Sequence, residues 1–270
     1  MDSITPRVDF TQQLTGIFNL HGKVAYVPGG YGGIGEAVAW ALAIAGARVA
    51  VSGRDGIKAG ALAAQLRGAG HEAMSLAMDA HSVPSMQGAV DDVARRFGRL
   101  DILVNCVGIH REESLLDATE EAFDEVVQVN LKSAMFHAQA AARHQIAGGR
   151  GGAQVHLLSV RAQLGLRGRG YSSYSSTKGA LVMLIKQHAA ELAPHGITVN
   201  GIAPTVVRTE MARHWLENPE TKKQVLDRIP LGRVADPHDV AGPAVFFASR
   251  AAGFVTGQVL YIDGGITATQ

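Results

Sequence analysis

The sequence predicts a doubly wound α/β domain, with a seven-stranded parallel sheet and helices on both faces. Two observations lead to this fold class. Short apolar segments alternate with helical segments along nearly the whole chain. These apolar segments lack the strict polar–apolar alternation of a half-exposed strand, which is typical of strands buried on both faces. Such a strand–helix alternation forms parallel sheets through right-handed crossovers.

The individual elements follow from hydrophobic period and from glycine and proline positions. The expected strands cover residues 23–27, 48–52, 72–78, 101–105, 154–159, 198–202 and 259–262. The expected helices cover residues 34–45, 56–67, 83–97, 120–145, 173–192 and 239–249. Residues 204–234 read as a long irregular or short-helical segment. Residues 1–16 are expected to form an extension outside the fold, which leaves one domain over residues 17–270.

Composition excludes several classes of protein. Of the 270 residues, 47% are hydrophobic and 18% are charged, which indicates a globular chain. The net charge is +1 without a run of like charge, so neither a nucleic acid nor a membrane surface is an expected partner. Cys106 is the single cysteine, so no intrachain disulfide can form. With no signal peptide or spanning segment, we expect a cytoplasmic protein.

Tyr174 and Lys178 are the first candidates for catalysis. They are four residues apart at the start of an expected helix, so they share one helix face. A free tyrosine has a pKa of about 10, which is too high for proton exchange at neutral pH. A lysine beside a partly desolvated phenol favours the ionised form. We therefore expect Tyr174 to be a general acid/base tuned by Lys178; the alternative is an exposed pair on a helix surface.

A glycine-rich turn follows the first expected strand. Residues 29–35 read Gly-Gly-Tyr-Gly-Gly-Ile-Gly and lead directly into a helix. Glycines there let the backbone approach a pyrophosphate, and the helix N-terminus offers free N–H groups to phosphates. No Gly-Lys-Ser/Thr follows, so this is not a P-loop. We expect a nucleotide-binding turn; the alternative is a tight turn without a ligand.

The end of the second strand bears on the choice between NADP and NAD. It reads Ser52-Gly53-Arg54-Asp55. An acid at this place bonds the ribose 2′-hydroxyl of NAD, whereas an arginine accommodates the 2′-phosphate of NADP. Glycine stands where we would expect the acid, and Arg54 follows it. The sequence favours NADP, with Ser52 and Arg54 at the phosphate; NAD, with Asp55 at the ribose, remains the alternative.

From about residue 20 to residue 265, the chain resembles the short-chain dehydrogenase/reductase family in its motifs and in their order. The matching segments are the cofactor loop at 28–35, Asn105-Cys-Val-Gly108, Asn130, Ser159, Tyr174-x-x-x-Lys178, the loop 204–209 and the ending 256–265. The chain departs from the family pattern at four positions: Pro28 for threonine, Cys106 and Val107 for Asn-Ala, and Thr205 for glycine. Ser159 also lies 15 residues before Tyr174, a long separation for this pattern.

The resemblance implies a Rossmann fold and a hydride transfer between a nicotinamide cofactor and a ketone or secondary alcohol. Tyr174 would exchange the proton, Lys178 would hold the ribose, Ser159 would bond the substrate oxygen and Asn130 would anchor a water beside the lysine. The remaining implied cofactor contacts are Gly29, Tyr31, Gly33, Ile34, Gly35, Asp79, Ala80, Asn105, Val107, Gly108, Pro204, Val207 and Thr209. The resemblance also implies a homotetramer or homodimer.

Three residues are candidate substrate contacts because they follow strand ends, where open α/β sheets bind ligands: His110, Arg111 and Arg161. An arginine there can clamp a carboxylate, although a solvated loop charge is an equal alternative for each. None of the 11 histidines belongs to an HExxH motif or a closely spaced ligand set, so no metal site is expected.

The loop from Gly108 to Thr119 is similar to the gluconate 5-dehydrogenase-like, sugar-acid subgroup of the family. We expect a small polar substrate such as a sugar or keto acid. The alternatives are a 3-oxoacyl thioester or broad carbonyl reductase and, from another class, a non-catalytic nucleotide-binding sensor or scaffold. Residues 204–234 include Met211, Trp215, Leu216 and Leu226, which would cover the substrate or bury in an oligomer interface.

Overall fold

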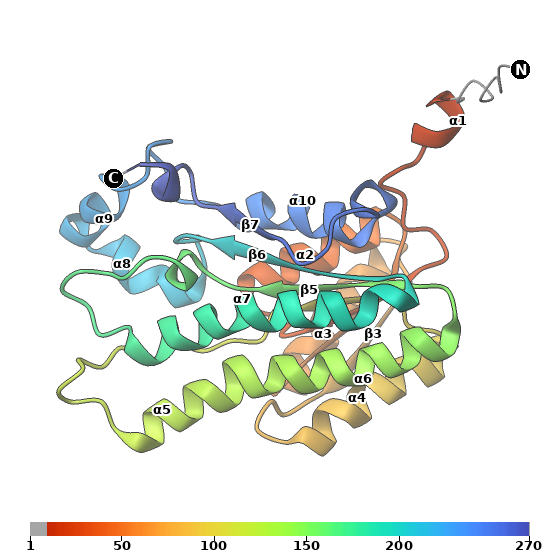
Figure 1. Cartoon of the computed structure of the whole chain (residues 1–270), viewed down its shortest axis with the longest axis horizontal. Coiled ribbons are helices and arrows are strands. Elements are labelled where there is room, and N and C mark those ends of the chain that lie inside the picture. Colours follow the sequence, from red (N-terminus) through yellow and green to blue (C-terminus); the bar gives the residue numbers. More distant parts are fainter. Residues whose placement is uncertain (1–9, 270) are drawn as a thin grey trace, which may run out of the picture.

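The structure is a computed structural model that describes residues 10–269. Seven parallel strands form one sheet in the order β3-β2-β1-β4-β5-β6-β7 (Figure 1). The strands are β1 (Val24–Pro28), β2 (Arg48–Gly53), β3 (Ala73–Ala77), β4 (Ile102–Asn105), β5 (Gly152–Leu157), β6 (Ile197–Pro204) and β7 (Val259–Ile262). The predicted fold class is confirmed.

Helices connect the strands. They are α1 (Phe10–Leu14), α2 (Gly33–Ile44), α3 (Gly56–Gly68), α4 (Val83–Phe97), α5 (Glu120–Val127), α6 (Ser133–Gly148), α7 (Ser172–Leu192), α8 (Arg213–Glu217), α9 (Pro219–Leu226) and α10 (Pro237–Ala248). Of the expected extension, residues 1–9 lie outside the described residues. Helix α1 lies apart from the sheet, and Arg250 donates to the Gln13 carbonyl at 2.9 Å (Figure 1). Among residues 10–269, no helix is both long and apolar enough to cross a bilayer.

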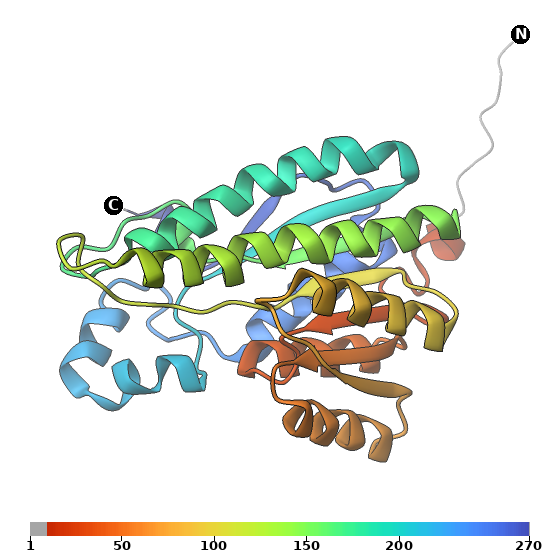
Figure 2. The same ribbon diagram turned by 90° about the horizontal axis from the view of Figure 1, so that it is seen from below.

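Helices cover both faces of the sheet because the strands are apolar on both sides. Helices α2, α3 and α10 pack on one face, where Val38, Leu42 and Phe247 are buried. Helices α4, α6 and α7 lie side by side on the other (Figure 2). Met86 and Val90 of α4 are fully buried against β1 and β2, as the apolar spacing of this helix predicts.

The strand order places a crevice at one edge of the sheet. β1 has β2 on one side and β4 on the other, so the chain reverses direction across the sheet at this point. In doubly wound sheets, ligands bind beyond the carboxyl ends of the strands at such a reversal. Helices α8 and α9 lie at this end of the molecule, beyond the end of β6 (Figure 1).

The long helix expected over residues 120–145 is interrupted. Helix α5 is followed by a π-helical turn, η1 (Gln128–Lys132), before α6 begins. Asn130 lies in this turn. Its Oδ1 accepts from the Ile109 N–H at 2.8 Å, and its Nδ2 donates to the Ile109 carbonyl at 3.0 Å. A π turn is a local widening that is frequent at functional sites, and here a tertiary contact to the loop after β4 accompanies it.

Two fully buried histidines lie between the sheet and its helices. Burial lowers the pKa of His137, on α6, to about 4, and that of His156, on β5, to about 3. His188, His137 and Lys178 add repulsion that lowers the pKa of His156 further. Within the described residues, neither ring nitrogen of His156 has a hydrogen-bond partner, so nothing compensates a charge there.

We expect the free energy of unfolding to fall as the pH drops below about 6.5, the pKa of a histidine in the unfolded chain. Below that pH, His137 and His156 are protonated in the unfolded chain, whereas in the folded chain they stay neutral until the pH reaches 3 to 4. Each of the two histidines then removes about 2 kcal/mol of stability by pH 5. Urea unfolding at pH 7.5 and pH 5.0 measures the loss. His156→Gln should reduce it and exposed His195→Gln should not; equal losses in both variants contradict the assignment.

Candidate active site

The four expected catalytic residues come together at the carboxyl ends of β4 and β5. Tyr174 and Lys178 lie on the first two turns of α7, and Lys178 Nζ is 5.5 Å from the centre of the Tyr174 ring. Ser159 follows β5, and its hydroxyl lies close enough to the Tyr174 phenol to lower the pKa of that phenol. Lys178 as a whole is only 3% exposed, and its ammonium donates to the Leu157 carbonyl at 2.8 Å.

Asn130 joins this group through its neighbours. Its Nδ2 donates to the hydroxyl of Thr177, on α7, at 3.3 Å. A methyl group placed on Gly108 would lie 3.5 Å from Asn130 Oδ1 and 3.6 Å from Lys178 Nζ. Gly108, in the loop after β4, therefore lies between the Asn130 amide and the Lys178 ammonium and is close to both.

The electrostatics of Tyr174 differ from the expectation. Burial raises the pKa of the phenol, and the opposing contributions come from the Ser159 hydroxyl and the Arg161 guanidinium. The predicted lowering of the Tyr174 pKa by Lys178 is not found. Burial lowers the pKa of Lys178 itself to about 8, so the ammonium is still mostly protonated at neutral pH. The residue that favours the phenolate through its charge is Arg161.

The glycine turn after β1 has the geometry that a dinucleotide pyrophosphate needs. Gly29 adopts a φ of +73°, and a Cβ there would lie 2.8 Å from the backbone of Cys106, so only glycine fits. Helix α2 begins after Gly32, which provides no side-chain cap. The first N–H groups of α2 are thus left for an anion, and the residues fit a nucleotide cofactor.

At the end of β2, the three candidate polar residues differ in availability. Ser52 is fully buried and its hydroxyl bonds the Tyr26 phenol at 2.6 Å, so its side chain does not reach the sheet edge as expected. Asp55 caps α3, where its carboxylate accepts from the N–H groups of Ile57 and Lys58. Arg54 is exposed, and no described residue forms a hydrogen bond or ion pair with it.

The other expected cofactor residues lie at or after the carboxyl ends of β3, β4 and β6. Asn105 Oδ1 accepts from the Val107 N–H at 3.1 Å, which shapes the turn after β4. Asp79, after β3, accepts from the His81 N–H at 3.0 Å. The Ala80 carbonyl accepts from Gln128 at 3.2 Å. After β6, which ends at Pro204, the Thr209 hydroxyl donates to the Val207 carbonyl at 3.3 Å, and Thr209 packs on Gly33 beside Ile34.

A cavity of about 400 Å³ opens in front of Tyr174 and Lys178. One wall is aromatic: His110 stacks on Tyr171 with ring centres 4.3 Å apart and meets Tyr174 edge-on at 5.1 Å. Trp215, from α8, completes this wall 6.1 Å from His110. His110 Nε2 and Trp215 Nε1 are buried and find no partner among the described residues. The hydrogen-bonding capacity of both nitrogens is therefore unused in this structure.

The charge of the cavity is positive. Four arginines line it, Arg161, Arg167, Arg169 and Arg228, and no aspartate or glutamate of the described chain does so. Arg169 is paired with Glu112 at 3.0 Å. Burial lowers the pKa of Arg161, and the charge of Arg228 lowers it further. Two guanidinium groups thus face one cavity without a carboxylate between them.

Arg111 does not join this cavity. Its guanidinium makes two bonds to Glu125, at 2.7 and 3.0 Å, on the solvent side of α5. His110 and Arg161 line the cavity as expected, whereas sequence reasoning missed Tyr171 and Arg228. Tyr171 lies just before α7 and reaches the cavity because the Glu113 N–H bonds the Gly170 carbonyl at 3.1 Å. No sequence motif marks Arg228.

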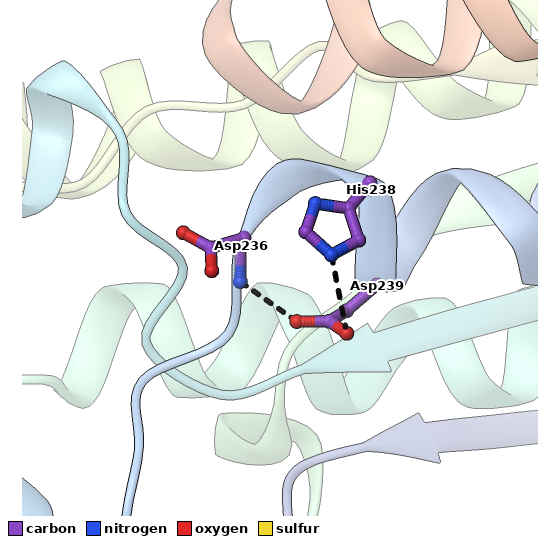
Figure 3. A group of neighbouring side chains, drawn as sticks. All are labelled: Asp236, His238 and Asp239. Carbon is purple, nitrogen blue, oxygen red and sulfur yellow. Dashed lines mark hydrogen bonds and ion pairs between the residues drawn. The ribbon is translucent and has the colours of Figure 1, made fainter.

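A separate cluster lies at the start of α10, where Asp236, His238 and Asp239 offer ligand atoms within 4.8 Å of one another (Figure 3). Its carboxylates already have partners. Asp239 accepts from Arg233 at 2.9 Å and from the Asp236 N–H at 2.8 Å, and Asp236 accepts from Arg208 at 2.9 Å. These bonds explain the cluster as a cap of α10.

Comparison with known proteins places this site in a family. Residues 29–267 match the family described as enoyl-(acyl carrier protein) reductase. L-rhamnose 1-dehydrogenase (NAD(P)(+)) of Azotobacter vinelandii is 38% identical over 90% of this chain and 96% of its own length. The 2-dehydro-3-deoxy-D-gluconate 5-dehydrogenase of Escherichia coli is 36% identical over 92% of this chain and 96% of its own.

A solved structure agrees with these relatives. The gluconate 5-dehydrogenase of Burkholderia cenocepacia, in complex with NADP and tartrate, superposes with a TM-score of 0.90. It is 35% identical, and the match covers 94% of this chain and 99% of that one. The chain belongs to the short-chain dehydrogenase/reductase family.

Proposed function

We propose that this protein is an NADP-preferring oxidoreductase that interconverts a ketone and a secondary alcohol on a small sugar acid or keto acid. The main support for an acidic substrate is the cavity in front of Tyr174. Four arginines line this cavity and, within the described chain, no carboxylate does. A neutral sugar would leave the charges of Arg161 and Arg228 uncompensated. A carboxylate neutralises them and accepts their charge-assisted hydrogen bonds.

The proton is handled by Tyr174. When bound, the nicotinamide cofactor supplies or accepts the hydride. Ser159 hydrogen-bonds the substrate oxygen and orients it toward the phenol, which donates its proton to a ketone or accepts one from an alcohol. Burial keeps the phenol protonated in the absence of substrate, and Arg161 limits the resulting rise of its pKa.

Lys178 and Asn130 serve the cofactor side of the site. The lysine uses one of its three donors on the Leu157 carbonyl, which leaves the others for ribose hydroxyls. Asn130 positions the loop after β4 through both of its bonds to Ile109 and borders the lysine across Gly108. This placement supports the expected role of Asn130 beside a water that links Lys178 to solvent.

The polar chain of the substrate would lie along the aromatic wall. His110 Nε2 and Trp215 Nε1 are unpartnered and able to hydrogen-bond hydroxyl groups, and the ring faces contact the C–H groups of an extended carbon chain. Met211 and Trp215 belong to the segment 204–234 and line the cavity, which supports that segment as the substrate cover.

Arg54 at the end of β2 supports NADP. Of the three polar candidates there, Ser52 is buried and Asp55 is engaged by α3, so the exposed guanidinium is the group left to meet a 2′-phosphate. The Burkholderia cenocepacia relative was solved with NADP and with tartrate, a dicarboxylate. This supports the same pairing of cofactor and substrate charge here.

Assembly is a further part of the proposal. Leu115 and Leu116, before α5, are 77% and 95% exposed, and Phe123 on α5 is 44% exposed. Exposed apolar side chains of this size support a homotetramer or homodimer that buries them. A cytoplasmic location stays a prediction of the sequence.

The test is the turnover of matched substrates. We expect NADP⁺ reduction with D-gluconate, or with a related sugar acid, at a kcat/KM about tenfold or more above that with D-glucitol, which replaces the carboxylate by a hydroxymethyl group. Each pair is measured with NADP⁺ and NAD⁺. Equal turnover of acid and polyol, or activity confined to apolar ketones or acyl thioesters, contradicts the proposed substrate class.

A further inference from the structure

The tyrosine of the glycine turn lies over the end of β2. Tyr31 stands between two glycines of the turn, and its hydroxyl accepts from the Asp55 N–H at 3.0 Å. Its ring covers Gly53, the last residue of β2. A Cβ placed on Gly53 would lie 2.9 Å from Tyr31 Cζ and closer still to Cε1, a separation that real Cβ atoms do not show.

Glycine at position 53 is explained by this ring and not by the backbone. Gly53 is not among the glycines with positive φ, so any residue could adopt its conformation. The strand cannot move aside easily, because Gly53 pairs with Ala77 in the sheet and its carbonyl accepts from the Met78 N–H at 3.0 Å. Any side chain larger than hydrogen would therefore have to displace Tyr31.

Tyr31 in turn is held at its far end. To swing away, the ring must break its bond to the Asp55 N–H. Asp55 is itself fixed, because its carboxylate caps α3 at Ile57 and Lys58 with bonds of 3.0 and 3.1 Å. Rotation of Tyr31 thus leaves the Asp55 N–H without its acceptor.

We propose that Tyr31 is a specificity-determining residue for the cofactor, because its ring excludes an acidic side chain from position 53. An acid at the end of β2 is the group that selects a free ribose 2′-hydroxyl and repels a 2′-phosphate. With Tyr31 in place, the 2′ position faces glycine and the unpaired, exposed Arg54. The preference for a phosphorylated ribose therefore depends on Tyr31 and Gly53 together, although the two residues belong to different segments.

Binding measurements on a double-mutant cycle test this coupling. The dissociation constants of NADP⁺ and NAD⁺ are measured by calorimetry, without substrate, for wild type, Tyr31→Ser, Gly53→Asp and the double variant. Gly53→Asp alone should weaken the binding of both cofactors by about tenfold or more, and its affinity for NAD⁺ should not rise above that of wild type. The double variant should bind NAD⁺ at least about tenfold tighter than Gly53→Asp, since one charge-assisted hydrogen bond is worth that much.

Two further variants separate the ring from its hydroxyl and from the charge. Tyr31→Phe keeps the ring, so Tyr31→Phe with Gly53→Asp should resemble Gly53→Asp alone. Gly53→Ala adds only a methyl group. It should weaken the binding of both cofactors when Tyr31 is present, but not in the Tyr31→Ser background. Thermal unfolding midpoints of all variants, with and without cofactor, identify any that fail to fold.

The coupling is overturned if Tyr31→Ser changes the affinity for NAD⁺ by the same factor in wild type and in Gly53→Asp, so that the two changes are additive. It is also overturned if Gly53→Ala has the same effect beside Tyr31 and beside serine. This inference rests on the proposed preference for NADP. Wild-type affinities test that preference separately, whereas additivity tests the residue pair whichever cofactor wild type prefers.

Discussion

Tyr174→Phe should lower kcat by about 10²- to 10⁴-fold and leave the affinity for NADP⁺ nearly unchanged. The substitution removes the hydroxyl that exchanges the proton and keeps the ring that packs against His110. Because Lys178 and the glycine turn are untouched, the cofactor should still bind. Steady-state turnover of a confirmed sugar acid gives the loss, and calorimetric titration with NADP⁺ gives the affinity.

Ser176→Ala is the matched control for this variant. Ser176 lies on α7 two residues after Tyr174 and its side chain is exposed, so its removal should change neither quantity. If Tyr174→Phe turned over substrate at the wild-type rate, the proton would have to pass through another group. A parallel loss in Ser176→Ala would point to a general disturbance of α7 instead.

Arg161→Gln should lower kcat/KM for a sugar acid roughly 10- to 100-fold, and that for the matching neutral polyol much less. The half-buried guanidinium faces the cavity beside Arg228 and provides charge that the neutral amide lacks. It also lowers the pKa of the Tyr174 phenol. The acid-side limb of the pH profile of alcohol oxidation, which reports formation of the phenolate, should therefore move to higher pH in the variant.

Arg161 also has a structural task, because it donates to the Leu164 and Gly165 carbonyls at 3.1 and 2.8 Å. The acid and polyol arms separate the two effects: collapse of this loop lowers both kcat/KM values equally, and that result contradicts a carboxylate contact. Arg161→Lys keeps the charge without the forked geometry and should recover part of the loss and most of the pH shift. Exposed Arg143→Gln, on α6, should leave both profiles unchanged.

Much of the fold could be predicted, because each strand and most helices carry their own pattern. The helix over residues 83–97 was predicted with the bounds that the structure has, since its apolar spacing and its terminal glycine are local signals. The break in the helix at Asn130 was missed. Its side chain bonds the loop after β4, and no property of residues 120–145 alone shows that contact.

The candidate site was predicted in part for the same reason. Tyr174 and Lys178 share a helix face, so their proximity follows from spacing. The direction of the shift in the Tyr174 pKa did not follow from this spacing. Burial, which depends on the packed fold, outweighs any other influence on the Tyr174 pKa, and the helping charge comes from Arg161 on another segment. Ser52 was misplaced because strand alternation turned its hydroxyl toward Tyr26 on the neighbouring strand.

The sequence by itself determined the fold class, the edge of the sheet where a cofactor is expected and the residues that are predicted to handle the proton. These depend on periodicity, on glycine and on short spacings, which act within one or two elements. Only the tertiary structure decided what the phenol faces. The aromatic wall and the arginines come from the loops after β4 and β5, from α8 and from the segment after α9, and they meet only because parallel strands end at one edge. The ring of Tyr31 over Gly53 is likewise a contact between the turn after β1 and the end of β2, which no single segment contains.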